Sequence, residues 1–259
     1  MPNIWEIYVW ICVDMYRLIY LSILLSAVFG TIVEDENTAI INGNLASIED
    51  FPYYAFLAVG KDLHCGGAFI ERNLVLTAAH CLGGQNIRVY SGISSLKDLK
   101  RKKGYAVKSA VPHPTFWTAP NSAFDIGLIK LKRKIQLGDE AQLIELATEA
   151  PPVGEEAIVV GFGVMQCEGI AACNEEVQDS DHLRSADIVI TNVLEDGTFL
   201  TQSRENMNTC YGDSGGPITH DGKVIGVVST GEVGDCRGFD IQGPVFTLLD
   251  WINKTKATM

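Results

Sequence analysis

Three short segments of the sequence carry the side chains of an activated nucleophile. His80 lies in LTAAHC, Asp125 in FDIGLIKL and Ser214 in CYGDSGGP. A serine hydroxyl is a weak nucleophile at neutral pH, and it becomes reactive when a histidine accepts its proton and a carboxylate orients that histidine. Each residue alone has an ordinary structural explanation in a turn, a cap or a cysteine neighbourhood. Together they predict nucleophilic acyl transfer, with His80, Asp125 and Ser214 as the catalytic residues.

The elements that position these residues are predicted to be short strands. Runs rich in Val and Ile, bounded by Gly, Asp or Asn, recur along the chain as NLVLTA (73–78), AIVVGFG (157–163), ADIVIT (186–191) and KVIGVVST (223–230). Such a pattern is typical of an all-β barrel or sandwich. The exception is the C-terminal VFTLLDWINK, where apolar residues recur at helical spacing and predict a terminal amphipathic helix.

The same segments resemble those of the chymotrypsin-like serine proteases, the trypsin family. The resemblance runs from about Ile40 to Asn253 and includes the motifs HCGGAFI, VVGFG and GPVFTLLDWI. It implies two six-stranded antiparallel β-barrels with the active site between them and a C-terminal helix. It also implies a serine endopeptidase that hydrolyses peptide bonds through an acyl-enzyme, without a cofactor or a metal. Its expected partners are protein or peptide substrates and protein inhibitors.

The resemblance assigns further roles around the nucleophile. The backbone N–H groups of Gly212 and Ser214 are expected to bind the oxyanion of the attacked carbonyl. Asp213 is expected to receive the new amino terminus of Ile40 once the chain is cut before IINGN. The residue before the cut is Ala39, where many relatives carry Arg or Lys, so the activating protease must accept a small residue.

The residues expected to bind substrate are Asn208, Ser229, Thr230 and Gly231. Asn208 stands six places before Ser214, where an aspartate in trypsin-like relatives attracts Arg or Lys. A neutral residue there predicts cleavage after large apolar or aromatic side chains, because an unpaired buried cation is costly. Two alternatives stay open. A charge could be restored by Asp235 or Asp240, or the pocket could be narrowed by a proline, Pro244.

The N-terminus predicts a secretory signal. The apolar run LIYLSILLSAVF follows Arg17 and is too short for a comfortable membrane span, which needs about 20 apolar residues. We expect a signal peptide at 1–30, with Met15 as an alternative start, an activation peptide at 31–39 and a peptidase domain of two barrels at 40–259. A retained signal anchor is the alternative interpretation of the apolar run.

The cysteines fit a secreted chain. Six follow the signal segment: Cys65, Cys81, Cys167, Cys173, Cys210 and Cys236. An even number implies disulfides, and six cysteines allow 15 pairings. The resemblance implies the pairs Cys65–Cys81 and Cys210–Cys236, and the two remaining cysteines are then expected to pair with each other.

Charge excludes some partners. The net charge of −12 opposes binding to nucleic acid and stable association with anionic membranes. We expect a secreted, extracellular monomer. The basic run KDLKRKKG (97–104) is expected to be a solvated hairpin loop, with an exosite for an acidic partner as the alternative. The loop from Ser91 to Gly104 has one acid and does not support a calcium site. NKT at Asn253 is a glycosylation sequon.

A second function class competes with the enzyme. A protease-like fold can serve as a binding or regulatory protein that no longer cuts. Such proteins usually lack one catalytic residue, whereas His80, Asp125 and Ser214 are all present here. The sequence therefore favours the enzyme.

Overall fold

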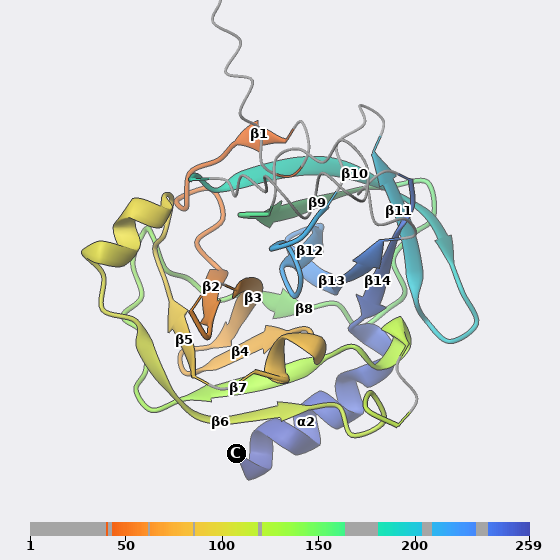
Figure 1. Cartoon of the computed structure of the whole chain (residues 1–259). Helices are drawn as coiled ribbons and strands as arrows, with labels where there is room; N and C mark the ends of the chain where they lie inside the picture. Colours follow the sequence, from red (N-terminus) through yellow and green to blue (C-terminus); the bar gives the residue numbers. More distant parts are fainter. Residues whose placement is uncertain are drawn as a thin grey trace, which may run out of the picture. The chain divides into compact units, whose positions relative to one another are not determined.

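The short Val- and Ile-rich runs form antiparallel strands in the computed structural model (Figure 1). The structure describes residues 40, 43–61, 63–84, 86–118, 121–163, 181–203, 209–231 and 238–259. Several sequence-based predictions lie outside these residues: the signal peptide 1–30, the activation peptide 31–39, Cys167, Cys173, Asn208 and Cys236. Among the described residues, no helix is long and apolar enough to cross a membrane.

The first barrel is a closed ring of six antiparallel strands in the order β2-β3-β4-β7-β6-β5. Its strands are β2 (Tyr54–Val59), β3 (Leu63–Glu71), β4 (Leu74–Thr77), β5 (Ile87–Tyr90), β6 (Tyr105–Pro112) and β7 (Gly127–Leu131). The interior is aliphatic, and Leu57, Leu76 and Leu128 are fully buried there. Closure removes exposed strand edges.

The second barrel also closes with six antiparallel strands. They are β9 (Glu156–Gly161), β10 (Arg184–Val193), β11 (Phe199–Ser203), β14 (Asp240–Pro244), β13 (Lys223–Gly231) and β12 (Pro217–His220). The ring closes because β9 pairs with both β10 and β12. Two short strands lie outside the ring: β1 (Asn44–Leu45) pairs with β10, and β8 (Glu145–Leu146) pairs with β13 in parallel. The predicted all-β fold of two six-stranded barrels is confirmed.

The C-terminal helix links the end of the second barrel to the first. The 3-10 turn η5 (Phe246–Leu248) leads into α2 (Leu249–Thr258), which lies beside β6 and β7 in Figure 1. Ile252 of α2 is fully buried in the core cluster of the first barrel. Trp251 packs on His113, with ring centroids 4.9 Å apart. The terminal amphipathic helix predicted from the apolar spacing is confirmed.

The basic run connects β5 to β6, as a hairpin loop would, and it contains a 3-10 helix, η2 (Leu96–Lys100). Ser95 and Asp98 form a capping box at its start. One oxygen of the Asp98 carboxylate accepts hydrogen bonds from the backbone N–H groups of Ser94 and Ser95. The single acid of this loop is therefore used as a helix cap.

Candidate active site

His80 and Asp125 meet at the ends of two neighbouring strands of the first barrel. His80 begins the turn η1 (His80–Leu82) just after β4, and Asp125 ends η3 (Ser122–Phe124) just before β7. Strands β4 and β7 are paired, with Thr77 opposite Gly127. This pairing brings the two residues together.

Both carboxylate oxygens of Asp125 contact His80. Asp125 Oδ1 accepts the backbone N–H of His80 at 2.9 Å, and Asp125 Oδ2 lies 2.7 Å from His80 Nδ1. Asp125 is buried, whereas the imidazole is partly exposed. Because a carboxylate can only accept, Nδ1 carries the proton of this bond and leaves Nε2 as the acceptor. The histidine is thus oriented as a base that presents Nε2.

A strand of the second barrel adds a third donor to this carboxylate. Ser229 Oγ of β13 donates to Asp125 Oδ2 at 2.7 Å and lies 3.1 Å from Ser122 Oγ. Ser229 was predicted to bind substrate, and the structure gives it this further contact. The sequence offered no signal for Ser122, because an isolated serine before an Asp is unremarkable in composition.

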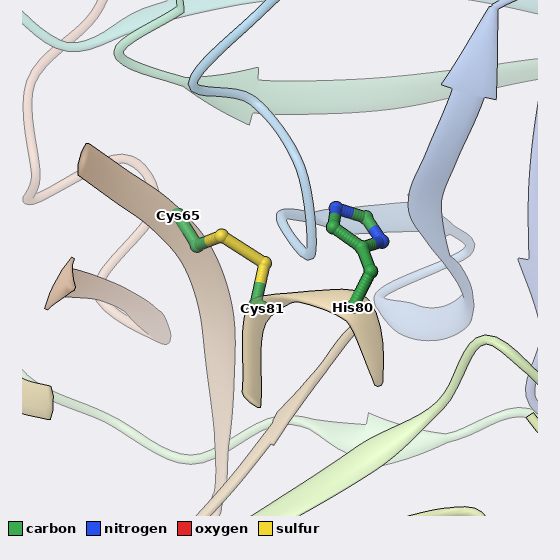
Figure 2. Close-up of side chains that lie close together, drawn as sticks. All are labelled: Cys65, His80 and Cys81. Carbon is green, nitrogen blue, oxygen red and sulfur yellow. A yellow bond between two sulfur atoms is a disulfide. The ribbon is translucent and has the colours of Figure 1, made fainter. Parts of the chain in front are cut away.

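The predicted disulfide Cys65–Cys81 is present and fixes η1 to β3 (Figure 2). The sulfur atoms and the ring of His80 lie close together in space. Both sulfurs are bonded to each other, so neither can act as a thiolate ligand, and this cluster offers a metal only one ligand. Cys210 is also disulfide-bonded. Its expected partner Cys236, and the expected pair Cys167 and Cys173, lie outside the described residues.

Ser214 lies on a turn of the second barrel that touches β3 of the first. The backbone N–H of Gly66 donates to Ser214 O at 2.8 Å, and Cys81 Sγ lies 3.6 Å from the same oxygen. A Cβ on Gly66 would stand 2.6 Å from the Cα of Gly216, so glycine is required where the two backbones meet. Within the described part of the chain, Ser214 Oγ has no hydrogen-bond partner, which leaves it free to attack.

Two backbone N–H groups beside Ser214 have no acceptor within the described part of the chain. In the segment from Gly212 to Gly216, the N–H groups of Asp213, Gly215 and Gly216 each donate to a backbone carbonyl. Those of Gly212 and Ser214 donate to no atom of the described residues. These two are the predicted oxyanion donors, and their freedom fits an anionic ligand.

Gly212 needs to be glycine for two reasons. Its φ of 96° lies in the region that side chains avoid. A Cβ there would also overlap the imidazole of His64, whose Nε2 lies 3.2 Å from the carbonyl oxygen of Phe162. His64 was not singled out in the sequence, and its proximity to the nucleophile turn depends on the closure of the first barrel.

Asp213 is fully buried, and its carboxylate receives backbone N–H groups only. Gly163 N donates to Oδ1 at 2.8 Å, and Cys210 N donates to Oδ2 at 3.0 Å. Side chains at Gly161 and Gly163 would overlap the carboxylate. Burial, and to a smaller extent the nearby Asp240, raise the pKa of Asp213 to about 7, against the lowering effect of the two backbone hydrogen bonds. No cation among the described residues pairs with it.

Ile40 is fully buried in the core of the second barrel. It packs in the same cluster as Ala157 and Val159 of β9, the strand that ends at Gly161 beside Asp213. Its φ is 44°, a region in which a β-branched residue is strained. This torsion is defined by the bond to Ala39, so it ceases to exist when that bond is cut.

The expected substrate strand runs along the end of β13. Gly231 pairs with Asp240, and Thr230 pairs with Ile241, in the ladder between β13 and β14. Asp240 is buried and accepts both the backbone N–H and the hydroxyl of Thr209, at 3.1 and 2.7 Å. Burial raises the pKa of Asp240 to about 6, opposed by these two bonds.

The idea that Pro244 narrows the pocket is not supported by the register of the strands. Pro244 pairs with Gly226, five residues before Gly231 on β13. At about 3.3 Å per residue, the two positions are roughly 16 Å apart along the strand. The residue beside Gly231 is Asp240, because the strand β14 begins there.

An imidazole oriented by a carboxylate on one barrel, and a serine on a glycine-rich turn of the other, are the residue types that serine peptidases with a chymotrypsin fold use as base and nucleophile. A sequence model of the family described as Trypsin matches residues 40–252. The chain therefore belongs to the trypsin family, and it is a serine endopeptidase, a hydrolase that acts on protein substrates.

Individual relatives are similar over most of their length. The chain is 32% identical over 203 residues to trypsin theta of Drosophila erecta, covering 74% of this chain and 76% of that protein. It is 29% identical over 252 residues to human kallikrein-4, covering 91% and 94%. The solved structure of neuropsin, a serine protease expressed in the limbic system of mouse brain, superposes with a TM-score of 0.73 at 28% identity, covering 83% of this chain and 99% of that one.

Proposed function

We propose that the protein is a secreted serine endopeptidase made as an inactive zymogen, in which Ser214 attacks the peptide carbonyl. His80 takes the proton of Ser214 and returns it to the leaving amine, and Asp125 holds the imidazole and stabilises its cationic form. The N–H groups of Gly212 and Ser214 bind the oxyanion, and an acyl-enzyme forms and is hydrolysed by water. The observation that carries the proposal is a pair of N–H groups that, like the hydroxyl of Ser214 beside them, have no hydrogen-bond partner among the described residues.

Activation follows from the buried carboxylate of Asp213. The signal peptide 1–30 is removed on secretion, and cleavage after Ala39 releases the activation peptide 31–39. The new ammonium group of Ile40 then pairs with Asp213. A buried carboxylate with its pKa near 7 and no cation is poorly stabilised, and such a partner offsets its desolvation. Because Asp213 lies between the two oxyanion donors, the pair orders both of them.

The proposed enzyme acts as a monomer on protein or peptide substrates and is open to protein inhibitors that occupy the same cleft. The neutral Asn208 predicts a primary pocket that accepts large apolar or aromatic side chains such as Phe, Tyr or Leu. Thr230, where relatives commonly carry tryptophan, predicts weaker selection at the neighbouring substrate residue.

A fluorophosphonate probe tests the proposal. The secreted chain is labelled before and after processing, and the active material is sequenced from its N-terminus. We expect labelling of Ser214 only in the form that begins at Ile40. A processed chain that stays unlabelled would instead indicate a binding protein that does not cut. An active enzyme that begins at Thr31 would contradict the pairing of Ile40 with Asp213.

A further inference from the structure

Charge is distributed very unevenly along the chain. Residues 88–134 hold eleven of the 20 lysines and arginines but only two of the 32 acids. Both of these acids are engaged, because Asp98 caps η2 and Asp125 is buried against His80. The remainder of the chain is strongly acidic, since the net charge of the whole is −12. The positive charge is therefore concentrated in one part of the first barrel.

Strands β5, β6 and β7, which lie side by side in Figure 1, bring several of these bases onto one face. Arg88 of β5 pairs with Ala106 of β6, and Lys132 donates its backbone N–H to the carbonyl of Ala106 from the other side. The adjacent Val89 and Leu131 are buried, so Arg88 and Lys132 point outward. Neighbouring strands are about 4.8 Å apart, which makes this row about 10 Å long.

The exposed bases of this region that form no ion pair with an acid among the described residues are called the basic face. They are Arg88, Lys100, Lys103, Lys132, Arg133 and Lys134. Lys100 is held on an ordered helix, because Leu96 and Leu99 of η2 pack against a core cluster and the capping box fixes its start. A charge run that only keeps a loop in solvent needs no such support.

A hollow of about 400 Å³ borders the basic face. Its lining is apolar at Ile87, Ala106, Val107 and Ala110, and Arg88 is its charged member. Arg88 and Ala106 thus belong both to the hollow and to the row that ends at Lys132. The hollow also reaches Gly84, four residues after His80 in the chain. An apolar surface therefore connects the region of the catalytic base to the basic face.

We propose that the basic face and this hollow bind an acidic segment of the protein substrate that follows the scissile bond and also carries apolar side chains. The inference rests on the proposed peptidase function and narrows its substrate class. Substrate residues before the scissile bond are expected to pair with β13 of the second barrel, so the residues after it are those that leave toward the first. Their carboxylates pair with Arg88 and Lys132, and their apolar side chains fill the hollow.

A short acidic peptide fits this surface better than an extended polyanion does. Nucleic acid, sulfated polysaccharide and anionic membrane would also be attracted by the basic face. Each of them extends beyond it and brings negative charge against the acidic remainder of the protein, which repels them. Nucleic acid and polysaccharide also lack apolar side chains for the hollow. A peptide that alternates acidic and apolar residues matches both the charge and the hollow.

The test compares matched peptides on the processed enzyme. Each has the same cleavage sequence and a flexible spacer, followed by a tract that mixes Leu with either Glu or its neutral analogue Gln. At low salt we expect KM for the acidic peptide to be about tenfold lower, with kcat within about twofold, and most of this difference to vanish in about 0.5 M NaCl. The double variant Arg88→Glu, Lys132→Glu should abolish the difference and leave a short peptide without the tract unaffected.

The matched control uses single charge reversals. Lys132→Glu and Lys223→Glu change the net charge equally, but Lys223 is exposed on β13 of the second barrel. We expect Lys132→Glu to raise KM for the acidic peptide about threefold and Lys223→Glu to leave it unchanged. Equal effects of the two variants, or a parent enzyme that does not distinguish the Glu tract from the Gln tract, overturn the proposal.

A third peptide tests the hollow. It keeps the Glu residues of the tract and replaces each Leu by Ser, which removes the apolar side chains. We expect its KM to be about fivefold higher than that of the Glu and Leu tract, because the hollow then buries no apolar surface. Equal KM values would mean that the face recognises charge alone, which contradicts the choice of a peptide over other polyanions.

A binding measurement separates this inference from the peptidase function itself. Fluorescence anisotropy follows a labelled Glu and Leu tract without a cleavage sequence on the processed Ser214→Ala protein. We expect saturable binding that is lost when Arg88→Glu and Lys132→Glu are added. Absence of binding to the Ser214→Ala protein overturns the docking surface even if the parent enzyme cleaves peptides. Absence of fluorophosphonate labelling of the parent, by contrast, overturns the proposed function, and the anisotropy result still decides on the surface.

Discussion

The two barrels bury their carboxylates in different ways. In the first barrel, Asp125 has an imidazole at 2.7 Å and a backbone N–H at 2.9 Å, both from His80. In the second barrel, Asp213 and Asp240 receive hydrogen bonds from backbone N–H groups and one hydroxyl. Neither has a cation among the described residues. In the uncut chain, the buried carboxylate of the first barrel is therefore paired with an imidazole, whereas the two buried carboxylates of the second barrel have no such partner among the described residues.

On the proposed function, Asp213 takes the ammonium group of Ile40, which exists only after the chain is cut. A buried carboxylate without a partner lowers the stability of the fold, so this ion pair favours the processed form. The first barrel holds the catalytic base, and the second barrel responds to processing.

The largest expected effect tests whether the barrels act as one catalytic unit. Ser214→Ala removes the nucleophile of the second barrel, and His80→Ala removes the base of the first. Each is expected to lower kcat of the processed enzyme about 10⁵–10⁶-fold, because neither half works alone. The double variant should be no slower than either single variant. Additive losses, measured by steady-state kinetics on one peptide, would mean that the two residues act independently.

A smaller effect is expected from the buried carboxylate of the second barrel. In the processed enzyme, Asp213→Asn removes the partner of the Ile40 ammonium and so disorders the oxyanion donors. Loss of one such donor costs about 10²–10³-fold in kcat. KM should change less, because the donors act on the transition state. A variant with kcat within threefold of the parent would show that the N–H groups are ordered without the ion pair.

In the uncut chain, the same substitution is expected to increase stability, whereas in the processed enzyme it lowers kcat. The pKa of Asp213 is raised from 3.8 to about 7, so its contribution to stability is present at low pH and is lost as pH rises from about 4 through 7. At pH 8, Asp213→Asn removes the buried charge but turns an amide NH2 toward one of the two backbone donors, so the free energy of unfolding of the uncut chain should rise by only about 1 kcal/mol. Urea titrations at pH 5 and pH 8 measure this, and the gain should be smaller at pH 5, where the folded carboxyl group is mostly protonated.

The strands and the terminal helix were predicted from local sequence, and the fold of two six-stranded barrels was predicted from the resemblance. The Val- and Ile-rich runs became β4, β9, β10 and β13, and the apolar spacing of the C-terminus became α2. The pairing of His80 with Asp125 was predicted from the residue types and from the resemblance, and not from spacing, because 45 residues separate them. The contact of Asp240 with Thr209 needed the ladder between β13 and β14. Register between strands distant in sequence is set by barrel closure, which no single segment specifies.

Local signals were also overlooked. The segment Ser95 to Asp98 has the spacing of a capping box, and it starts the 3-10 helix η2 inside a run that was expected to be a plain loop. His64 and Ser122 gave no such signal. Their proximity to Gly212 and Ser229 depends on backbone paths that only the assembled barrels define.

The smallest effect concerns the contact that joins the barrels at Asp125. Ser229→Ala removes the hydroxyl that donates to Oδ2 at 2.7 Å, while the imidazole and backbone contacts of His80 persist. A hydrogen bond to a charged group contributes about 1.5–3 kcal/mol, and water can replace part of it, so we expect kcat to fall about fivefold to tenfold. Thr191→Ala, which removes an exposed hydroxyl on β10, is the matched control and should have no effect. If Ser229→Ala instead raised KM alone, the hydroxyl would serve substrate binding, and the first barrel would hold its carboxylate without help from the second.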